Sequence, residues 1–254
     1  MLLVVDVGNT NSTVGLFDGA RLAHQWRVSS VGRTVDELGL LLMQLLAHRG
    51  VATASLTGAA LVSVVPALVP TFERAIQRYL GQPTAVLDHR SDLGFPLRVD
   101  DPRTLGPDRV VNAVAMREKY APPFLIIDFG TATTFDCVDA SGAFVGGAIA
   151  PGLQISADAL TSRTARLPRV EITRPAAAIG TNTVSAITSG LFWGYVGLVD
   201  GLARRCKDEL GANVPCVATG GLSAVVGGAC REIDAVDENL TLDGLRIWFG
   251  RGAK

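Results

Sequence analysis

Two stretches of the chain repeat one pattern, and this pattern decides the fold. They are residues 2–17, LLVVDVGNTNSTVGLF, and residues 124–138, FLIIDFGTATTFDCV. In each stretch an apolar run typical of a buried strand ends at an aspartate, Asp6 or Asp128, and a glycine turn and a second apolar run follow. Each stretch is therefore predicted to form a β-hairpin that holds a carboxylate at the end of its first strand.

The repetition continues past these turns. Asp18-Gly19 and Ser141-Gly142 are hairpin signals, and each is followed by a further predicted strand. Asp6 and Asp128 lie 122 positions apart, which is close to half of the 254 residues. Because five successive features agree at nearly this offset, we interpret the chain as an internal duplication.

Helical patterns follow the strands in both halves, at about residues 35–48 and 182–211. This arrangement predicts an α/β fold with two mixed-sheet halves around a central cleft, and we place the halves at residues 1–115 and 116–254. Small residues in the second helical stretch, three and four positions apart, leave room for another helix from this chain or from a second subunit; they are Gly190, Gly194, Gly197 and Gly201.

Composition narrows the class of protein. With 48% hydrophobic and 19% charged residues, the chain can bury a large core. A net charge of -1 with scattered basic residues argues against a nucleic-acid partner. The N-terminus lacks a signal-peptide pattern, and the apolar helical stretch 38–47 is too short to cross a bilayer, so we expect a cytoplasmic protein without a membrane partner. The cysteines show no C-x-x-C pair and no zinc-ligand spacing, which favours buried, reduced thiols; they are Cys137, Cys206, Cys216 and Cys230.

The first hairpin has the composition of a phosphate site. Gly8 lets the backbone approach a phosphate, and the Asn and Thr side chains that follow offer neutral donors. The Asp6 carboxylate is placed to hold Mg²⁺, directly or through its waters. An ordinary turn would use the same residues to bond its own backbone, but the second Asp-x-Gly-Thr copy at Asp128 favours phosphate binding.

The Walker A pattern G-x-x-x-x-G-K-S/T and the patterns G-x-G-x-x-G and G-x-S-x-G are absent from the sequence. A phosphate site built from paired hairpins, instead of a loop and a helix N-terminus, is the remaining option.

Two further predicted loops, residues 106–109 and 180–183, each precede a predicted helix. Asp108 could accept a proton from a substrate hydroxyl that attacks the γ-phosphorus, and Arg109 could hold an anionic group. Spacing alone favours the alternative that Asp108 only faces the helix macrodipole and Arg109 is solvated. Likewise, residues 180–183 could bind a carboxylate, although helix capping is the commoner role. Gly220-Gly221 could accommodate a nucleotide base or ribose, or form a tight turn.

The order and joint occurrence of these segments resemble the type III pantothenate kinases of bacteria. These belong to the acetate and sugar kinase, heat-shock protein and actin superfamily, which implies a duplicated ribonuclease H-like (actin-like ATPase) fold. The resemblance covers nearly the whole chain and is carried by residues 6–11, 106–113, 128–134, 147–152, 167–170, 179–201 and 218–221.

The resemblance implies ATP-dependent phosphorylation of pantothenate to 4′-phosphopantothenate, the first step of coenzyme A biosynthesis, by a homodimer. It implies that Asp108 is the general base, that Asp6 organises Mg²⁺, and that Asp128 holds a monovalent cation, K⁺ or NH₄⁺. The implied ATP contacts are Asp6, Val7, Gly8, Asn9, Thr10, Asn11, Ser12, Thr13 and Thr131. The implied substrate contacts are Gly106, Pro107, Asp108, Arg109 and Thr183.

One position departs from the family pattern. Val99 stands where the family usually has a substrate-contacting tyrosine, so this contact is missing, shifted or supplied by another residue such as Phe95. The departure motivates a second hypothesis, a kinase of another small hydroxylated acid. A third hypothesis is a non-catalytic regulator that retains the fold, and the three aspartates Asp6, Asp108 and Asp128 argue against it.

Overall fold

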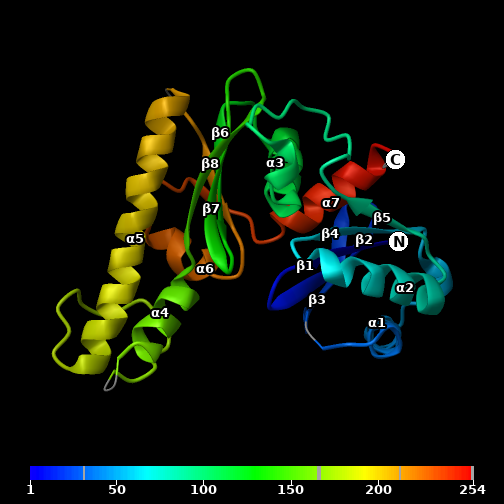
Figure 1. Cartoon of the computed structure of the whole chain (residues 1–254), viewed down its shortest axis with the longest axis horizontal. Helices are drawn as coiled ribbons and strands as arrows, with labels where there is room; N and C mark the ends of the chain where they lie inside the picture. The colour runs from blue at the N-terminus through cyan, green and yellow to red at the C-terminus, as the bar shows by residue number, and fades with distance from the viewer. Residues whose placement is uncertain (31, 165–166, 212, 253–254) are drawn as a thin grey trace. The chain divides into compact units, whose positions relative to one another are not determined.

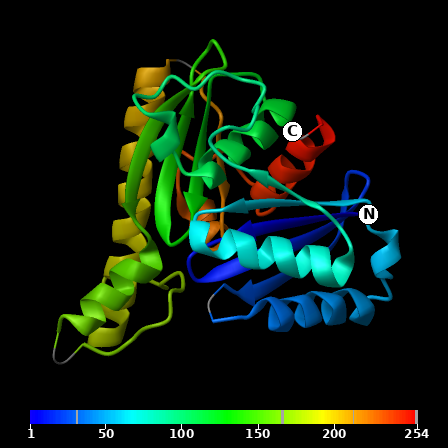
Figure 2. The ribbon, with the colours of Figure 1, turned by 45° about the vertical axis from the view of Figure 1, so that its right-hand side comes forward.

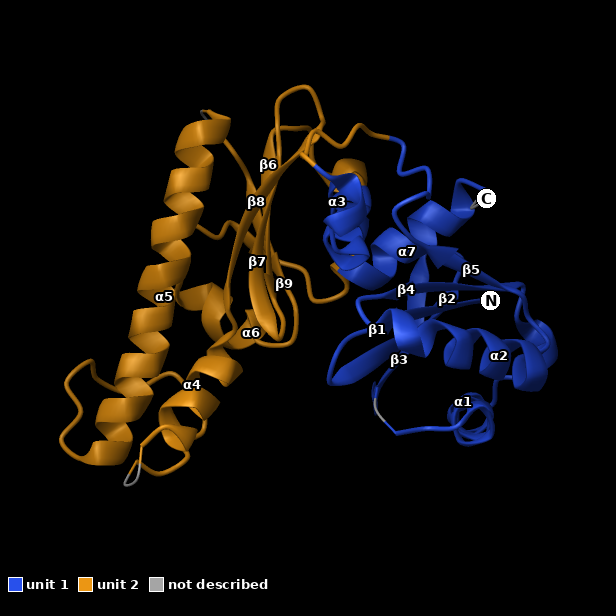
Figure 3. Ribbon diagram, in the orientation of Figure 1, with its two compact units in different colours: residues 1–94, 101–116, 241–254 blue, residues 95–100, 117–240 orange. Residues whose placement is uncertain are grey.

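The computed structural model describes residues 1–30, 32–164, 167–211 and 213–252. Figures 1 and 2 show the helices and strands in two orientations. The chain divides into two compact units (Figure 3). Unit 1 comprises residues 1–94, 101–116 and 241–254, and unit 2 comprises residues 95–100 and 117–240.

Unit 1 is built on a mixed five-stranded sheet with the order β3-β2-β1-β4-β5. The first three strands form an antiparallel meander, and β4 and β5 continue parallel to β1. Between β2 and β3 the tight turn depends on Gly19, whose φ of 61° is unfavourable for other residues. The strands are β1 Leu2–Val7, β2 Asn11–Asp18, β3 Arg21–Ser29, β4 Gly58–Ser63 and β5 Thr84–Leu87.

Helices cover both faces of this sheet. On one face, Leu38 and Leu42 of α1 and Ile76 of α2 join strand residues in a single buried cluster. On the other face α7 packs against the strands, because a Cβ added to Gly58 of β4 would meet the Phe249 ring at 2.5 Å. α7 also lies close to α3, since a Cβ added to Gly244 would collide with the Val111 carbonyl. The helices are α1 Val35–His48, α2 Val69–Leu80, α3 Pro107–Lys119, of which residues 107–116 belong to unit 1, and α7 Leu240–Gly250, with 3₁₀ turns at Thr53–Ser55, Pro66–Leu68 and Pro102–Thr104.

Unit 2 repeats this sheet. Its strand order is β10-β9-β6-β7-β8, and every pair of neighbouring strands has the same relative direction as its counterpart in unit 1. The strands are β6 Phe124–Phe129, β7 Ala132–Val138, β8 Phe144–Pro151, β9 Cys216–Thr219 and β10 Ala235–Val236. The equivalent order and directions confirm the predicted duplicated α/β fold.

The helices of unit 2 include one exceptionally long member, α5 (Thr183–Leu210). Its buried residues recur every three or four positions and pack on one face of the sheet, and the glycines at 190, 194, 197 and 201 do not interrupt it. By length and composition α5 could cross a membrane, but such a test is also met by core helices of soluble proteins. The other helices are α4 Leu153–Ser162 and α6 Ser223–Val226, followed by the 3₁₀ turn Gly227–Ala229.

Candidate active site

The first hairpin lies between β1 and β2 in unit 1. Asp6 is the penultimate residue of β1 and is paired across the ladder with Thr13, and both are half-buried. Gly8 closes the turn by donating its N–H to the Asn11 carbonyl at 3.2 Å. A Cβ at Gly8 would lie 2.8 Å from that carbonyl oxygen, so a larger residue would open the turn. The turn thus presents exposed polar groups beside a half-buried carboxylate.

The eight predicted ATP contacts of this hairpin fall into three groups by exposure, and one of these groups, Asp6, Gly8, Asn11 and Thr13, is half-buried. Asn9 and Thr10 are exposed at its tip, whereas Val7 and Ser12 are buried. The Ser12 hydroxyl lies 2.8 Å from that of Ser30, a hydrogen bond that ties β2 to the end of β3. The side chain of Ser12 therefore has a structural partner within the sheet. Sequence reasoning did not identify Ser30.

The second hairpin, between β6 and β7 in unit 2, is a shorter version of the first. Asp128 is again the penultimate strand residue and half-buried, and it pairs with Thr134. Only Gly130 and Thr131 separate the two strands, whereas three residues separate β1 from β2. Thr131 is exposed at the tip, in a position comparable to Thr10.

Two glycines enclose the second hairpin, and sequence reasoning gave neither of them this role. Gly152, the N-cap of α4, donates its N–H to the Thr131 carbonyl at 3.2 Å. Gly220, directly after β9, has a φ of 91°, and a Cβ there would collide with Asp128 Oδ1 and lie 2.7 Å from the Phe129 nitrogen. The carboxylate of Asp128 is therefore held between its own hairpin and the turn after β9.

The return strand of the second hairpin carries a buried acid. Asp136 is fully buried, and the Thr134 hydroxyl donates to its Oδ2 at 3.1 Å. On the opposite side of the strand, the hydroxyls of Thr133 and Tyr195 form a hydrogen bond between β7 and α5. These side-chain bonds fix the hairpin strand from both sides.

The loop of residues 106–109 places Asp108 in the first turn of α3. The helix begins at Pro107. The Arg109 N–H donates to Asp108 Oδ1 at 2.9 Å, and a Cβ at Gly106 would lie 2.6 Å from the same oxygen. Gly106 thus leaves the space that the carboxylate occupies. Burial raises the pKa of Asp108, although the Arg109 N–H and the Arg109 charge favour its ionised form.

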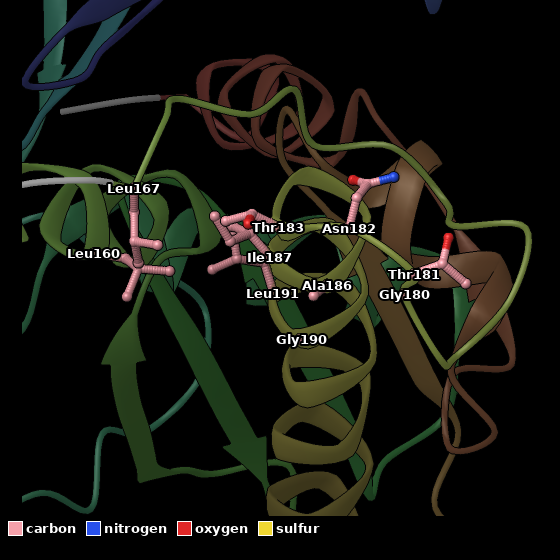
Figure 4. Close-up of a pocket in the computed structure, with 10 residues that line it drawn as sticks. All are labelled: Leu160, Leu167, Gly180, Thr181, Asn182, Thr183, Ala186, Ile187, Gly190 and Leu191. Carbon is pink, nitrogen blue, oxygen red and sulfur yellow. The ribbon is translucent and has the colours of Figure 1, made fainter.

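Thr183 lies at the start of α5 in unit 2, beside a pocket of about 660 Å³. Figure 4 shows Thr183 and Ile187 on the side of α5 that faces Leu160 and Leu167. Asn182 caps the helix by accepting the Ser185 N–H at 2.9 Å, so the predicted capping role is confirmed. Gly152, the N-cap of α4, lies beside Thr131, and Leu160 of the same helix lies beside Thr183. Gly152 and Leu160 are eight residues apart. Within unit 2 roughly 12 Å of helix therefore separates the Thr183 pocket from the hairpin of Asp128.

Comparison with known proteins identifies the family of the chain. Residues 2–205 match the family model described as type III pantothenate kinase. The chain belongs to the type III pantothenate kinase family. It is 47% identical to the type III pantothenate kinase of Koribacter versatilis (strain Ellin345) over 99% of this chain and 96% of the relative. It is also 47% identical to that of Myxococcus xanthus (strain DK1622), over 99% and 98% of the two chains.

Several solved structures share the fold of this chain although their sequence identity to it is low. One is the activator of 2-hydroxyisocaproyl-CoA dehydratase from Clostridium difficile, with a TM-score of 0.54, 13% identity, and coverage of 99% of this chain and 95% of that chain. Another is the polyphosphate/ATP-glucomannokinase from an Arthrobacter species, with a TM-score of 0.51, 14% identity and 98% coverage of both chains. These similarities support the actin-like fold class.

Val99, the position predicted to depart from the family pattern, lies in unit 2. Val99 is half-buried, and its Cγ1 would be 3.9 Å from a Cβ added to Gly146 of β8. Four residues earlier, the Phe95 ring lies beneath the Arg117 guanidinium, 5.3 Å from it. Phe95, the suggested replacement for the family tyrosine, is therefore in contact with Arg117.

The donor atoms at the two hairpins suit hard cations. Carboxylate, hydroxyl, amide and backbone carbonyl oxygens are the ligands that Mg²⁺ and monovalent cations use. Among the described residues no group of three or more His, Cys, Asp or Glu side chains forms a complete metal cage. A site with one protein carboxylate is the arrangement expected where Mg²⁺ keeps several waters and binds substrate phosphates. The chemistry of Asp6 and its neighbours fits such an ion.

Gly220→Ala is predicted to destabilise the protein by about 1–3 kcal/mol, because alanine disfavours a positive φ and its Cβ would collide with the hairpin. The free energy of unfolding, measured by urea denaturation, tests this. The matched control is Gly250→Ala at the end of α7, where a Cβ meets nothing within 4 Å and φ is not positive. Equal stability of the two variants would show that the turn after β9 adapts freely.

Proposed function

We propose that this protein is an ATP-dependent pantothenate kinase that produces 4′-phosphopantothenate in coenzyme A biosynthesis. The observation that carries the proposal is the family match over residues 2–205. The presence of all three aspartates at strand or helix ends, Asp6, Asp108 and Asp128, supports a catalytic member of the family.

In the proposed reaction, the terminal hydroxyl oxygen of pantothenate attacks the γ-phosphorus of ATP, and ADP leaves as the β–γ bridging bond breaks. Asp108 accepts the hydroxyl proton. Its raised pKa makes the carboxylate a stronger base than an exposed aspartate, which suits this role. Arg109 orients the anionic substrate through its guanidinium.

The two hairpins have different proposed tasks. Asn9, Thr10 and the turn backbone bind ATP phosphates, with Asp6 oriented to hold Mg²⁺. That ion would supply neutralisation of phosphate charge. Thr131 is the proposed ATP contact of the second hairpin, and Asp128 the proposed ligand of K⁺ or NH₄⁺. Alignment and electrostatic stabilisation should account for most of the rate enhancement.

The experiment that tests the function is ADP release by the purified protein with Mg²⁺, ATP and pantothenate, with and without K⁺. We expect turnover that depends on pantothenate and rises with K⁺ at constant ionic strength. Na⁺ at the same concentration is the control. Absence of turnover with pantothenate and with every related hydroxy acid would favour the non-catalytic regulator.

Val99 is the observation that favours a second candidate, a kinase of another small hydroxylated acid. The same assay with a panel of related acids separates the two substrates. If pantothenate is the substrate, Val99→Tyr should lower its KM by about fivefold, because one added hydrogen bond contributes about 1 kcal/mol. Val99→Phe, which lacks the hydroxyl, is the matched control and should leave KM closer to that of the wild type.

We further propose a cytoplasmic homodimer. Gly190, Gly194 and Gly197 are exposed along α5, and a Cβ at any of them would meet nothing within 4 Å, so the helix surface is open to a second helix. Light scattering at micromolar concentration should give the molar mass of two chains. A monomeric mass would contradict this part of the proposal.

A further inference from the structure

Three polar side chains form a row across the sheet of unit 2, at the end of the strand that leads into the second hairpin. Asp128 on β6 pairs with Thr134 of β7 on one side and with Thr219 of β9 on the other. Residues paired in this way place their side chains on the same face of the sheet. The Asp128 carboxylate is therefore flanked by a threonine on each neighbouring strand.

The row lies on the face of the sheet opposite α5. Ile127 and Phe129, on either side of Asp128, belong to the buried cluster that includes α5, and so does Ala218, the residue before Thr219. Successive strand residues point to opposite faces, so Asp128 and Thr219 point away from that cluster. The three polar side chains thus share a face that the α5 cluster does not use.

The hydroxyl of Thr219 is the unusual member of the row. Thr219 is only 1% exposed, and its Oγ1 has no hydrogen-bond partner among the described residues. A buried hydroxyl without a partner destabilises a fold and calls for an explanation. A ligand bound beside Asp128 would supply the missing partner.

The other oxygens of the row are placed to accept. The Thr134 hydroxyl donates its hydrogen to Asp136 Oδ2 at 3.1 Å, which leaves its lone pairs for another contact. An ionised Asp128 carboxylate only accepts. Gly220, directly after Thr219, lies so close that a Cβ there would collide with Asp128 Oδ1. This set of oxygens suits a cation and not an anion.

The duplication provides a comparison for the row. In unit 1 the equivalent residues are Thr13 of β2, Asp6 of β1 and Val62 of β4. Val62 is fully buried, as Thr219 is, but it has no hydroxyl. A single oxygen therefore distinguishes the strand beside Asp128 from the strand beside Asp6.

We propose that Thr219 is a ligand of the monovalent cation at Asp128, with the Thr134 hydroxyl as a second neutral ligand. This inference rests on the cation site that the proposed function assigns to Asp128. Neutral oxygens can replace the hydration shell of K⁺, and one carboxylate balances its single charge. Since Val62 stands at the equivalent place in unit 1, the first hairpin lacks this ligand.

The test is thermal unfolding of the full chain, without nucleotide or pantothenate, in KCl and in choline chloride at equal ionic strength. An ion that binds only the folded protein raises the melting temperature, so K⁺ should stabilise the wild type. In Thr219→Val the K⁺ concentration that gives half of this rise should increase by about 10- to 100-fold, as expected for the loss of one polar contact to a charged group. Its melting temperature in choline chloride should not fall, because the lost hydroxyl bonds no described residue.

Thr133→Val is the matched control. Thr133 is also fully buried, but its hydroxyl bonds Tyr195 of α5. This variant should melt at a lower temperature in both salts and keep the K⁺ response of the wild type. If Thr219→Val behaves in the same way, its hydroxyl has a structural role and the proposal is wrong.

Two further variants cover the case in which valine is not accommodated at this position. Thr219→Ser, which keeps the hydroxyl, should retain the K⁺ response, and Thr219→Ala should lose it. A wild type that K⁺ does not stabilise would overturn the cation site at Asp128 and this inference with it. A K⁺ response that Asp128→Asn loses but Thr219→Ala keeps would overturn the role of Thr219 alone. Neither result depends on turnover, which ADP release measures separately.

Discussion

Asp108→Asn is expected to lower kcat by about 10²- to 10⁴-fold, the usual contribution of a general base, while the protein still folds. Asparagine keeps an oxygen that can accept the Arg109 N–H, which donates to Asp108 Oδ1 at 2.9 Å. It also fits the space left by Gly106. What it loses is the ability to take a proton. Steady-state kinetics measured at saturating ATP and pantothenate, with circular dichroism as the check of folding, test this.

The same variant should be more stable than the wild type at neutral pH. Because burial raises the pKa of Asp108 in the folded protein, ionisation of this carboxyl opposes folding. The protonated Asp108 carboxyl stabilises the folded protein. This stabilisation is fully present below the unfolded pKa of about 4 and is lost as the pH rises through the folded pKa. The gain in melting temperature of Asp108→Asn should therefore be present at pH 7 and vanish below about pH 4.

Asp101→Asn is the matched control for both effects. Asp101 lies seven residues earlier, where a hydrogen bond from Arg103 lowers its pKa. Its ionised form therefore favours folding, so this substitution should not stabilise the protein at pH 7 and should leave kcat unchanged. Turnover of Asp108→Asn close to that of the wild type would remove Asp108 from the chemistry.

The hairpins could be predicted from the sequence because their signals are local. An apolar run, an aspartate and a glycine turn determine the position of Asp6, and the structure has a β1 that ends one residue later. The helix predicted at about residues 35–48 also matches α1, whose start is fixed by the capping box of Thr34 and Glu37. Repetition of such local signals was enough to predict the duplication.

Features that depend on contacts distant in sequence could not be predicted in this way. α7 contains Gly244, which weakens its helical pattern but permits its close approach to Val111 of α3. Nothing in residues 241–254 indicates that they belong with unit 1. Similarly, the role of Gly220 beside the second hairpin follows from strand order, because β9 lies next to β6. The role of Gly152 follows from the pairing of β8 with β7.

The duplication also allows two similar turns to take the different tasks proposed above. Shortening of the turn after β6 leaves Gly130 and Thr131 where the first hairpin has Gly8, Asn9 and Thr10. Gly220 then brings the backbone after β9 against Asp128. The first hairpin has more side-chain donors for phosphate, whereas the second encloses its carboxylate more tightly, as expected for a site that retains a cation with fewer waters.

Asp6→Asn should accordingly reduce kcat by about 10²- to 10³-fold, the effect of removing one electrostatic contact to the transition state, and should raise the Mg²⁺ concentration needed for half-maximal activity. Asparagine keeps one oxygen and the strand pairing with Thr13, so the fold should remain. Titrations of activity with Mg²⁺ at fixed ATP and fixed K⁺ measure both changes.

Asp128→Asn is the matched control, because it makes the same change at the equivalent position of the second hairpin. This variant should shift the K⁺ dependence while its Mg²⁺ dependence stays close to that of the wild type. If the two variants instead show the same pattern of Mg²⁺ and K⁺ dependence, the division of tasks between the hairpins is wrong.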